Sequence, residues 1–200
     1  MKGQVVIVYL WVLVFMVTIN PTPTRCAYYS VAKPLQPLKP NLVQLNFYVR
    51  ENLTGLNATA IVVAHGPRTQ QRSDTAALSF GTLLVVDDPI TEIPNGKPIG
   101  SARGYYAATS LKSEELTLVM TLVFSFTTGL YNGSSLSVLG VSHPLSNNRS
   151  MSVVGGTGLL FLAGGPVAVT TITRNTSSFD AILSLKVNVI YYDKPSSLTS

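Results

Sequence analysis

Apolar and polar residues alternate along most of the chain after residue 40, as they do in strands that bury one face. In residues 116–127, leucine, methionine and phenylalanine recur at every second position, with threonine and serine among the residues between them. Residues 43–49 and 181–189 show the same period of two. Because successive side chains of a strand point to opposite faces, each stretch presents one apolar face to a core. We therefore predict a strand in each.

Further strand-like stretches are separated by short segments rich in glycine, proline, asparagine and aspartate, residues that favour turns. No stretch carries apolar residues at the spacing of a helix. About eight short strands without helical crossovers predict a single all-β domain, an antiparallel sandwich or barrel. Closure into a barrel would also remove exposed strand edges. The further strands are predicted at residues 58–64, 80–86, 99–110, 134–139, 151–154 and 159–173.

The N-terminus has the pattern of a secretory signal peptide. Lys2 precedes an uncharged apolar run at residues 5–19, and Pro21 and Pro23 follow it. The run is shorter than the roughly 20 residues that cross a bilayer as a helix. A membrane anchor is the alternative interpretation.

Cleavage after Cys26 or Ala27 would leave a mature chain without cysteine, in which disulfides play no part. The next stretch contains several prolines and no periodicity, which is typical of a flexible arm. The predicted organisation is a signal peptide at 1–26, an arm at 27–40, a barrel domain at 41–193 and a tail at 194–200.

Asn-x-Ser/Thr sequons support a secretory route. Glycans attached to them would require surface positions. The five predicted glycosylation sites are Asn52, Asn57, Asn132, Asn148 and Asn175.

Charge and residue types exclude several classes of function. The formal charge is +5, and removal of Lys2 and Arg25 with the signal peptide lowers it to +3, with the basic residues scattered. A nucleic-acid partner is therefore not expected. The two histidines, His65 and His143, have no metal-ligand partner at useful spacing, and we predict no metal and no cofactor. Any chemistry must use carboxyls, tyrosines, arginines and hydroxyls.

A glycine-rich stretch at residues 155–158 resembles a phosphate-binding loop only superficially. It lies between two strand-like runs and opens no helix, so it lacks the helix N-terminus on which such loops depend. We interpret it as a tight turn.

One predicted strand has an unusual face. In residues 100–108, Gly100, Ala102, Gly104 and Ala108 share a face with a single large residue, Tyr106. A core face normally requires bulk to reach native packing density. Large side chains of adjacent strands could fill the space, or a ligand could.

Three further side chains are candidates for a site. Glu51 ends the apolar row of its strand, where desolvation would favour a general acid, although a strand-end carboxylate can also turn into water. Asp87 and Asp88 would point to opposite faces if their strand extends that far, whereas Pro89 favours a turn there. Arg149, in a polar segment interpreted as a loop, could bind an anionic or phenolic oxygen or remain solvated.

An ordered series of short segments resembles the dirigent family of plant proteins. Together the segments cover about residues 41–190. The matching residues are Phe47-Tyr48-Val49-Arg50-Glu51 through Asn57-Ala58-Thr59-Ala60, Phe80-Gly81-Thr82 through Asp87-Asp88-Pro89-Ile90-Thr91, Gly100-Ser101-Ala102-Arg103-Gly104-Tyr105-Tyr106-Ala107, Tyr131-Asn132-Gly133 through Gly140, and Val153-Val154-Gly155-Gly156-Thr157-Gly158.

The resemblance implies an eight-stranded antiparallel β-barrel, commonly a homotrimer, secreted to the plant apoplast. Members steer the coupling of two phenoxy radicals, such as those of coniferyl alcohol, into one lignan enantiomer. They have no oxidative activity of their own, and a separate laccase or peroxidase makes the radicals. Related members are lyases that act through quinone methides, including isoflavanol dehydratases that close the pterocarpan ring. Both chemistries require a roomy apolar pocket with acids or bases near the phenolic oxygens.

The resemblance also assigns site residues. Glu51, Tyr106 and Arg149 are the expected catalytic residues, and Phe47, Asp88 and Phe179 are the expected substrate-binding residues. Glu51 stands where the family usually has Asp after His, and Arg50 replaces that His. We expect the Arg50 cation to favour an ionised Glu51.

Two departures from the family pattern leave the coupling reaction open. An expected acid is absent around His143, and Gly164 replaces an expected arginine. The alternatives are a stereochemical guide, a quinone-methide lyase or cyclase of the pterocarpan synthase type, and a carbohydrate-binding module. A carbohydrate-binding module would need exposed aromatic residues, yet the single tryptophan, Trp11, lies in the predicted signal peptide.

Overall fold

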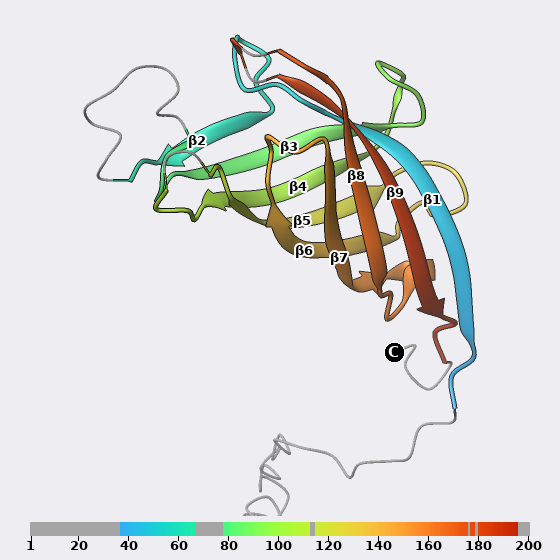
Figure 1. The fold of residues 1–200 in the computed structure, drawn as a ribbon. Coiled ribbons are helices and arrows are strands. Elements are labelled where there is room, and N and C mark those ends of the chain that lie inside the picture. Colours follow the sequence, from blue (N-terminus) through green and yellow to red (C-terminus); the bar gives the residue numbers. More distant parts are fainter. Residues whose placement is uncertain (1–36, 67–77, 113–114, 176, 179, 196–200) are drawn as a thin grey trace, which may run out of the picture. The chain divides into compact units, whose positions relative to one another are not determined.

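The computed structural model describes residues 37–66, 78–112, 115–175, 177–178 and 180–195 (Figure 1). The predicted signal peptide, most of the predicted arm and Phe179 lie outside these residues. The described part contains strands and short turns and no α-helix. Its strands are β1 (Pro40–Glu51), β2 (Ala60–Ala64), β3 (Leu83–Thr91), β4 (Pro98–Ala108), β5 (Leu118–Phe126), β6 (Ser135–Ser142), β7 (Asn148–Thr157), β8 (Gly165–Arg174) and β9 (Ala181–Tyr192).

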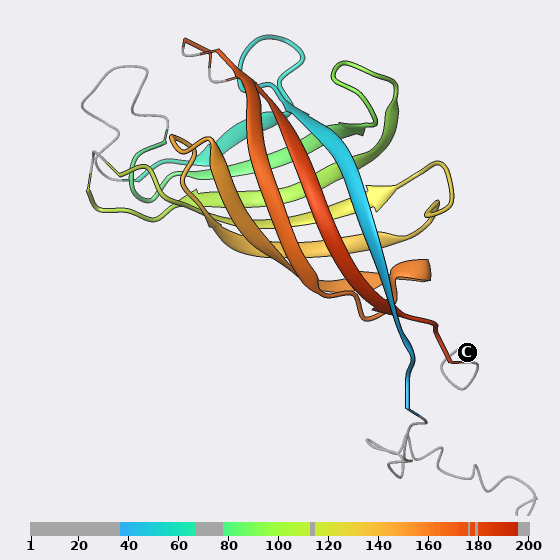
Figure 2. The same cartoon turned by 45° about the vertical axis from the view of Figure 1, so that its right-hand side comes forward.

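The strands form one antiparallel sheet in the order β1-β9-β8-β7-β6-β5-β4-β3-β2, and β1 also pairs with β3. β2 pairs with the first half of β3, and the end of β1 pairs with its last residues, so β1 and β2 share one position in the sheet. The result is a closed barrel with eight strand positions, which confirms the predicted fold. Figure 2 shows β8, β9 and β1 lying side by side and crossing β3 to β6 at a steep angle.

The core follows the predicted alternation. In β5 the side chains of Leu118, Leu122, Phe124 and Phe126 are buried, while Val119 faces outward. β3 and β9 repeat this pattern with fully buried aliphatic residues on the inner face. The inner faces of the strands therefore meet in one continuous core, as a small closed barrel requires.

Two predictions at and after the glycine-rich stretch 155–158 were wrong. Gly155 and Gly156 belong to β7 and form no turn. The turn begins at Gly158, whose φ is +62°, and continues as a 3-10 helix, η3 (Gly158–Leu160). Residues 159–164 are consequently not the start of the predicted strand 159–173. A Cβ on Gly156 would lie 2.2 Å from the Leu160 carbonyl oxygen, so glycine is needed for the chain to fold back over β7.

Two segments interpreted as turns or loops are strands. β3 continues through Asp87, Asp88 and Pro89 to Thr91, because β4 pairs with β3 along this whole length and the end of β1 pairs with Ile90 and Thr91. Arg149 is the second residue of β7 and pairs with Val169 of β8. Their side chains are therefore positioned by the barrel wall.

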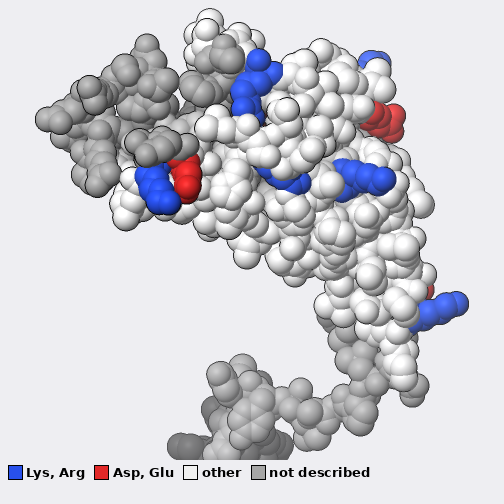
Figure 3. All heavy atoms as spheres, viewed as in Figure 1, with Lys and Arg blue, Asp and Glu red and all other residues white. Residues whose placement is uncertain are grey.

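The outer surface carries few charges. Lys and Arg side chains stand apart from one another on the face shown in Figure 3. Outward apolar residues are frequent on the strands, among them Ile61, Val85, Leu139 and Val154. None of the helical segments in the described ranges has the length and apolar character of a membrane span.

Replacement of Gly100 by Ala is expected to lower the free energy of unfolding by about 1–3 kcal/mol. A Cβ there would lie 2.1 Å from the Ser125 carbonyl oxygen of the neighbouring strand, and backbone must move to relieve that clash. Gly155→Ala is the matched control, because its Cβ would meet nothing within 4 Å. Urea unfolding of both variants measures the difference, and equal stability would contradict the close approach.

Candidate functional site

The inner wall encloses a cavity of about 240 Å³ next to the β1–β2, β4–β5 and β6–β7 connections. Most of its wall is aliphatic, and β5 and β9 contribute more of the lining residues than any other strand. A mostly apolar cavity with a few polar groups is the usual form of a site for a small aromatic ligand. The polar residues that line it are Glu51, Asp88, Tyr106, Ser142, Arg149 and Arg174.

Glu51 and Tyr106 form a direct pair in this cavity. The Tyr106 hydroxyl donates a hydrogen bond of 2.6 Å to Oε1 of Glu51. Glu51 is the last residue of β1, and the unbroken register from Pro40 keeps it on the same face as the apolar side chains. Tyr106 is buried on the inner face of β4. The two strands thus bring a carboxyl group and a phenol together inside an apolar wall.

Burial controls the protonation of this pair. Desolvation raises the pKa of Glu51, against the lowering effects of the Tyr106 hydrogen bond and of the Arg149 and Arg174 charges. Desolvation and the neighbouring Glu51 also raise the pKa of Tyr106 above its usual value. The phenol is therefore a hydrogen-bond donor throughout the physiological pH range.

The expectation for Arg50 was wrong. Its side chain is exposed on the outer face of β1, and the cations that act on Glu51 are Arg149 and Arg174. Because side chains alternate along a strand, residues adjacent in sequence point to opposite sides of the wall.

Asp88 supplies a second acid. It is 5% exposed, and its Oδ1 accepts a hydrogen bond of 2.6 Å from the Thr59 hydroxyl. Desolvation, with the nearby Glu51 carboxyl, raises the pKa of Asp88 to about 8. Asp87 points outward and forms an exposed ion pair of 2.9 Å with Arg103. One aspartate of the pair is thus a buried neutral acid below about pH 8.

Arg149 and Arg174 lie on the side of the cavity formed by β7 and β8. Nη2 of Arg149 donates to the Thr171 hydroxyl oxygen at 2.7 Å, and Nη2 of Arg174 approaches the same oxygen at 3.4 Å. Arg174 also donates to the carbonyl oxygen of Pro144. Desolvation and the Arg174 charge lower the pKa of Arg149, as expected for two close cations.

The residues predicted as substrate-binding are only partly brought together. Phe47 is 2% exposed, lies outside the cavity wall and packs edge-on against Phe124 and Phe126, at centroid distances of 5.3 and 5.9 Å. In the β4–β5 pair, Gly100 lies opposite Phe126 and Ala102 lies opposite Phe124. The phenylalanine rings therefore fill the space beside these two small residues. The face of β4 with small residues therefore packs against core aromatic rings at Gly100 and Ala102 and borders the cavity at Tyr106. Phe179 lies outside the described residues.

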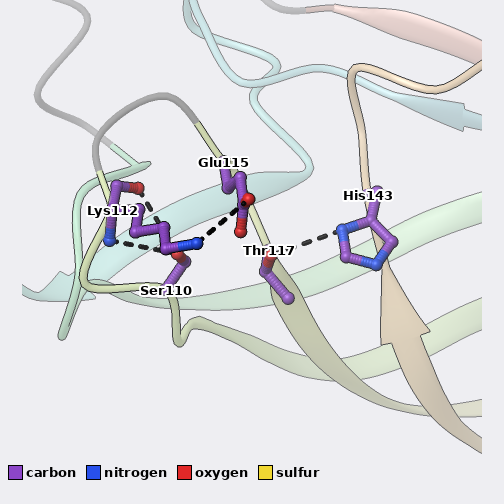
Figure 4. Close-up of polar contacts among 5 residues, drawn as sticks. All are labelled: Ser110, Lys112, Glu115, Thr117 and His143. Carbon is purple, nitrogen blue, oxygen red and sulfur yellow. Dashed lines mark hydrogen bonds and ion pairs between the residues drawn. The ribbon is translucent and has the colours of Figure 1, made fainter.

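His143 lies at the rim, outside the cavity wall. Its Nδ1 is 3.3 Å from the hydroxyl of Thr117, which is half-buried, while the His143 side chain is exposed (Figure 4). Lys112 and Glu115 form a second exposed contact of 3.5 Å on the same connection. No group of three or more His, Cys, Asp or Glu side chains in the described ranges could hold a metal ion.

Sequence reasoning missed Arg174 and Thr171. Strict alternation from the buried Val167 and Val169 would turn Arg174 outward. The register of β8 against β9 shifts between Thr171 and Thr173, and Arg174 then lies opposite Ala181, a residue of the cavity wall. A bulge of this kind reverses the parity of every later residue. No sequence signal locates it.

Together these groups can hold an aromatic ring and exchange protons with its oxygens. Asp88 can donate a proton, the Glu51–Tyr106 pair can accept or relay one, and two guanidinium groups can stabilise negative charge.

Comparison with known proteins identifies the family of this chain. The model of the dirigent-like proteins matches residues 42–190. The chain is 37% identical to dirigent protein 11 of Arabidopsis thaliana over 147 residues, which cover 72% of this chain and 73% of that protein. It is 34% identical to pterocarpan synthase 1 of Glycine max over 170 residues, 82% of this chain and 88% of that protein.

A solved structure extends the agreement to three dimensions. The structure of the pterocarpan synthase dirigent protein GePTS1 matches with a TM-score of 0.74 and 30% identity, covering 82% of this chain and 100% of that one. The family match spans the barrel from β1 to β9 and includes every polar residue of the cavity. The chain belongs to the dirigent-like family.

Proposed function

We propose that this protein steers the stereochemistry of phenolic coupling and that a separate laccase or peroxidase makes the radicals. The observation that supports this most directly is the acid–base group inside an apolar cavity: Tyr106 bonded to Glu51 at 2.6 Å, with Asp88 nearby. An aromatic radical held in this cavity would expose only one face to its partner. Fixed orientation of two reactants is itself a large contribution to rate and selectivity.

The proposed chemistry balances without an oxidant in the barrel. Two phenoxy radicals pair their single electrons in a new C–C bond and give quinone methides. A hydroxyl then attacks the methide carbon and loses its proton to a base, the role we give to Glu51. Asp88 protonates the quinone methide oxygen and restores the phenol, which completes the ring closure.

The test is a laccase-driven coupling of coniferyl alcohol with and without excess purified protein, analysed by chiral chromatography. The proposal expects one enantiomer in excess when the protein is present and a racemate when it is absent. A racemic product at excess protein would exclude coniferyl alcohol coupling as the function.

A second candidate is a quinone-methide lyase of the isoflavanol dehydratase type. It is favoured by a specific observation, the raised pKa of Asp88, because loss of a benzylic hydroxyl as water requires a protonated acid. The base would take the phenolic proton, and a second hydroxyl would add to the resulting quinone methide. Similarity to pterocarpan synthase 1 of Glycine max also supports it. Incubation with a racemic isoflavanol and no oxidase distinguishes the candidates, since turnover would exclude a pure guide.

We further propose a secreted, N-glycosylated homo-oligomer, with a trimer as the favoured form, that acts in the apoplast. Asn57, Asn132, Asn148 and Asn175 are exposed, while Asn52 is half-buried, so four predicted sites are open to a glycan. Apolar residues on the outer faces of β2 to β7 support an interface between copies. Light scattering of protein from apoplastic fluid measures the mass of the assembly and tests the oligomer. A fall in mass after treatment with N-glycosidase tests the glycosylation. A monomer of unchanged mass would contradict them.

A further inference from the structure

Two guanidinium groups share one wall of the cavity and one neutral partner. Both Nη2 atoms contact the Thr171 hydroxyl oxygen, at 2.7 Å from Arg149 and 3.4 Å from Arg174, so they lie no further than about 6.1 Å apart. The Nε atom of Arg149 is buried and has no hydrogen-bond partner among the described residues. Two close cations with an unused donor are the arrangement expected around an anion.

No carboxylate of the described residues neutralises them directly. The ion pairs found there, Arg103 with Asp87 and Lys112 with Glu115, are both exposed and outside the cavity. Glu51 is engaged by the Tyr106 hydroxyl.

The remaining acids do not change this balance. Asp180 accepts from the Leu53 amide at 2.8 Å and from the Ser178 hydroxyl at 2.7 Å. Asp88 is neutral below about pH 8. The two cations thus face at most one ionised carboxylate in the cavity, Glu51, and the cavity carries net positive charge.

We propose that Arg149 and Arg174 form an anion subsite and that the natural ligand is an aromatic monocarboxylate rather than a neutral phenolic alcohol. The aliphatic wall holds the ring, and the guanidinium groups bind the carboxylate through charge-assisted hydrogen bonds. Arg174 reaches this position only through the bulge in β8, so it is the specificity-determining member of the pair. The inference rests on the proposed function in so far as the ligand is phenolic.

Two probes with the same ring test the subsite: ferulate, which carries a carboxylate, and coniferyl alcohol, which carries a neutral hydroxyl. Calorimetric titration at about pH 6 keeps the carboxylate of ferulate ionised. We expect ferulate to bind at least about tenfold more tightly than coniferyl alcohol, and Arg174→Gln to remove about tenfold of that affinity while leaving the alcohol unchanged. Arg103→Gln, an exposed arginine of the same barrel, is the matched control and should change neither affinity.

The wild-type comparison is decisive even if Arg174→Gln does not fold. Equal or tighter binding of the alcohol, binding of neither probe, or an equal loss of both in the folded variant would overturn the subsite. Binding needs no oxidase and no turnover, so its result is separate from the proposed function. Ferulate preference with a racemic coupling product would leave the subsite standing and exclude the coupling of coniferyl alcohol. Stereoselective coupling of coniferyl alcohol without a binding preference for ferulate would support the proposed function and overturn the subsite.

Discussion

Glu51→Gln is expected to reduce stereoselective product formation by about 100-fold or more, the usual contribution of a positioned acid–base group. Glutamine fills the same space and can still accept a hydrogen bond from Tyr106, but it cannot take up a proton. The wild-type bond of 2.6 Å joins the phenol to a carboxyl group whose pKa is raised by burial. The measurement is the rate of formation of the major enantiomer under constant radical supply, or of the ring-closed product from an isoflavanol.

Two companion variants make this result specific. Glu92→Gln removes an exposed carboxylate from the β3–β4 connection and should leave rate and enantiomeric excess unchanged. Tyr106→Phe keeps the ring in the wall and removes only the hydroxyl, so it should impair the reaction while the protein stays folded. An unchanged rate and enantiomeric excess in Glu51→Gln would mean that this carboxyl group has no role in the chemistry.

Much of this site could be predicted because strands have a period of two. Glu51, Asp88 and Tyr106 each lie an even number of positions from buried residues of the same strand, without a bulge between them. Their inward direction therefore follows from the alternation of apolar residues alone. The closed barrel follows from the same pattern, because nearly every strand has one apolar face to bury.

The arginine wall could not be predicted in the same way. Arg149 faces the cavity because β7 pairs with β8 in a register that sets Arg149 opposite Val169. The short polar segment around Arg149 does not predict a strand from sequence. Arg174 faces inward because one irregular step in β8 reverses its parity. The raised pKa of Asp88 likewise depends on burial inside the closed barrel and then on the Glu51 carboxyl, which comes from a strand distant in sequence. Contacts between strands that are far apart in sequence decide both features.

Asp88→Asn is expected to flatten the pH dependence of stability. The carboxyl has a pKa of about 8 in the folded protein and about 4 in an unfolded chain. Below about pH 4 it is protonated in both states, and its contribution to stability is fully present. Between these values only the unfolded chain releases the proton, so the free energy of unfolding falls by up to about 1.4 kcal/mol per pH unit. The contribution is lost once the pH has risen through the folded-state pKa.

Asparagine can still accept the Thr59 hydrogen bond but has no proton to lose. Urea unfolding at several pH values from about 4 to 8 should therefore show a growing advantage of Asp88→Asn over the wild type. Glu51 contributes in the same direction in both proteins, so the difference between them reports Asp88 together with its interaction with Glu51. Asp87→Asn, which neutralises the exposed neighbour, is the matched control and should leave the slope unchanged. Parallel curves for Asp88→Asn and wild type would contradict a raised pKa.

Asp88→Asn is also expected to lower activity in the same pH range in which it raises stability. If Asp88 donates the proton to the quinone methide oxygen or to a leaving hydroxyl, its amide cannot replace it, and product formation should fall in the pH range in which the variant is more stable. A surface or core aspartate with a purely structural role would not link these two effects. In the wild type, the buried Asp88 carboxyl lowers the stability of the barrel as the pH rises. A residue with this disadvantage is expected where the proton that it holds below about pH 8 is used in the reaction.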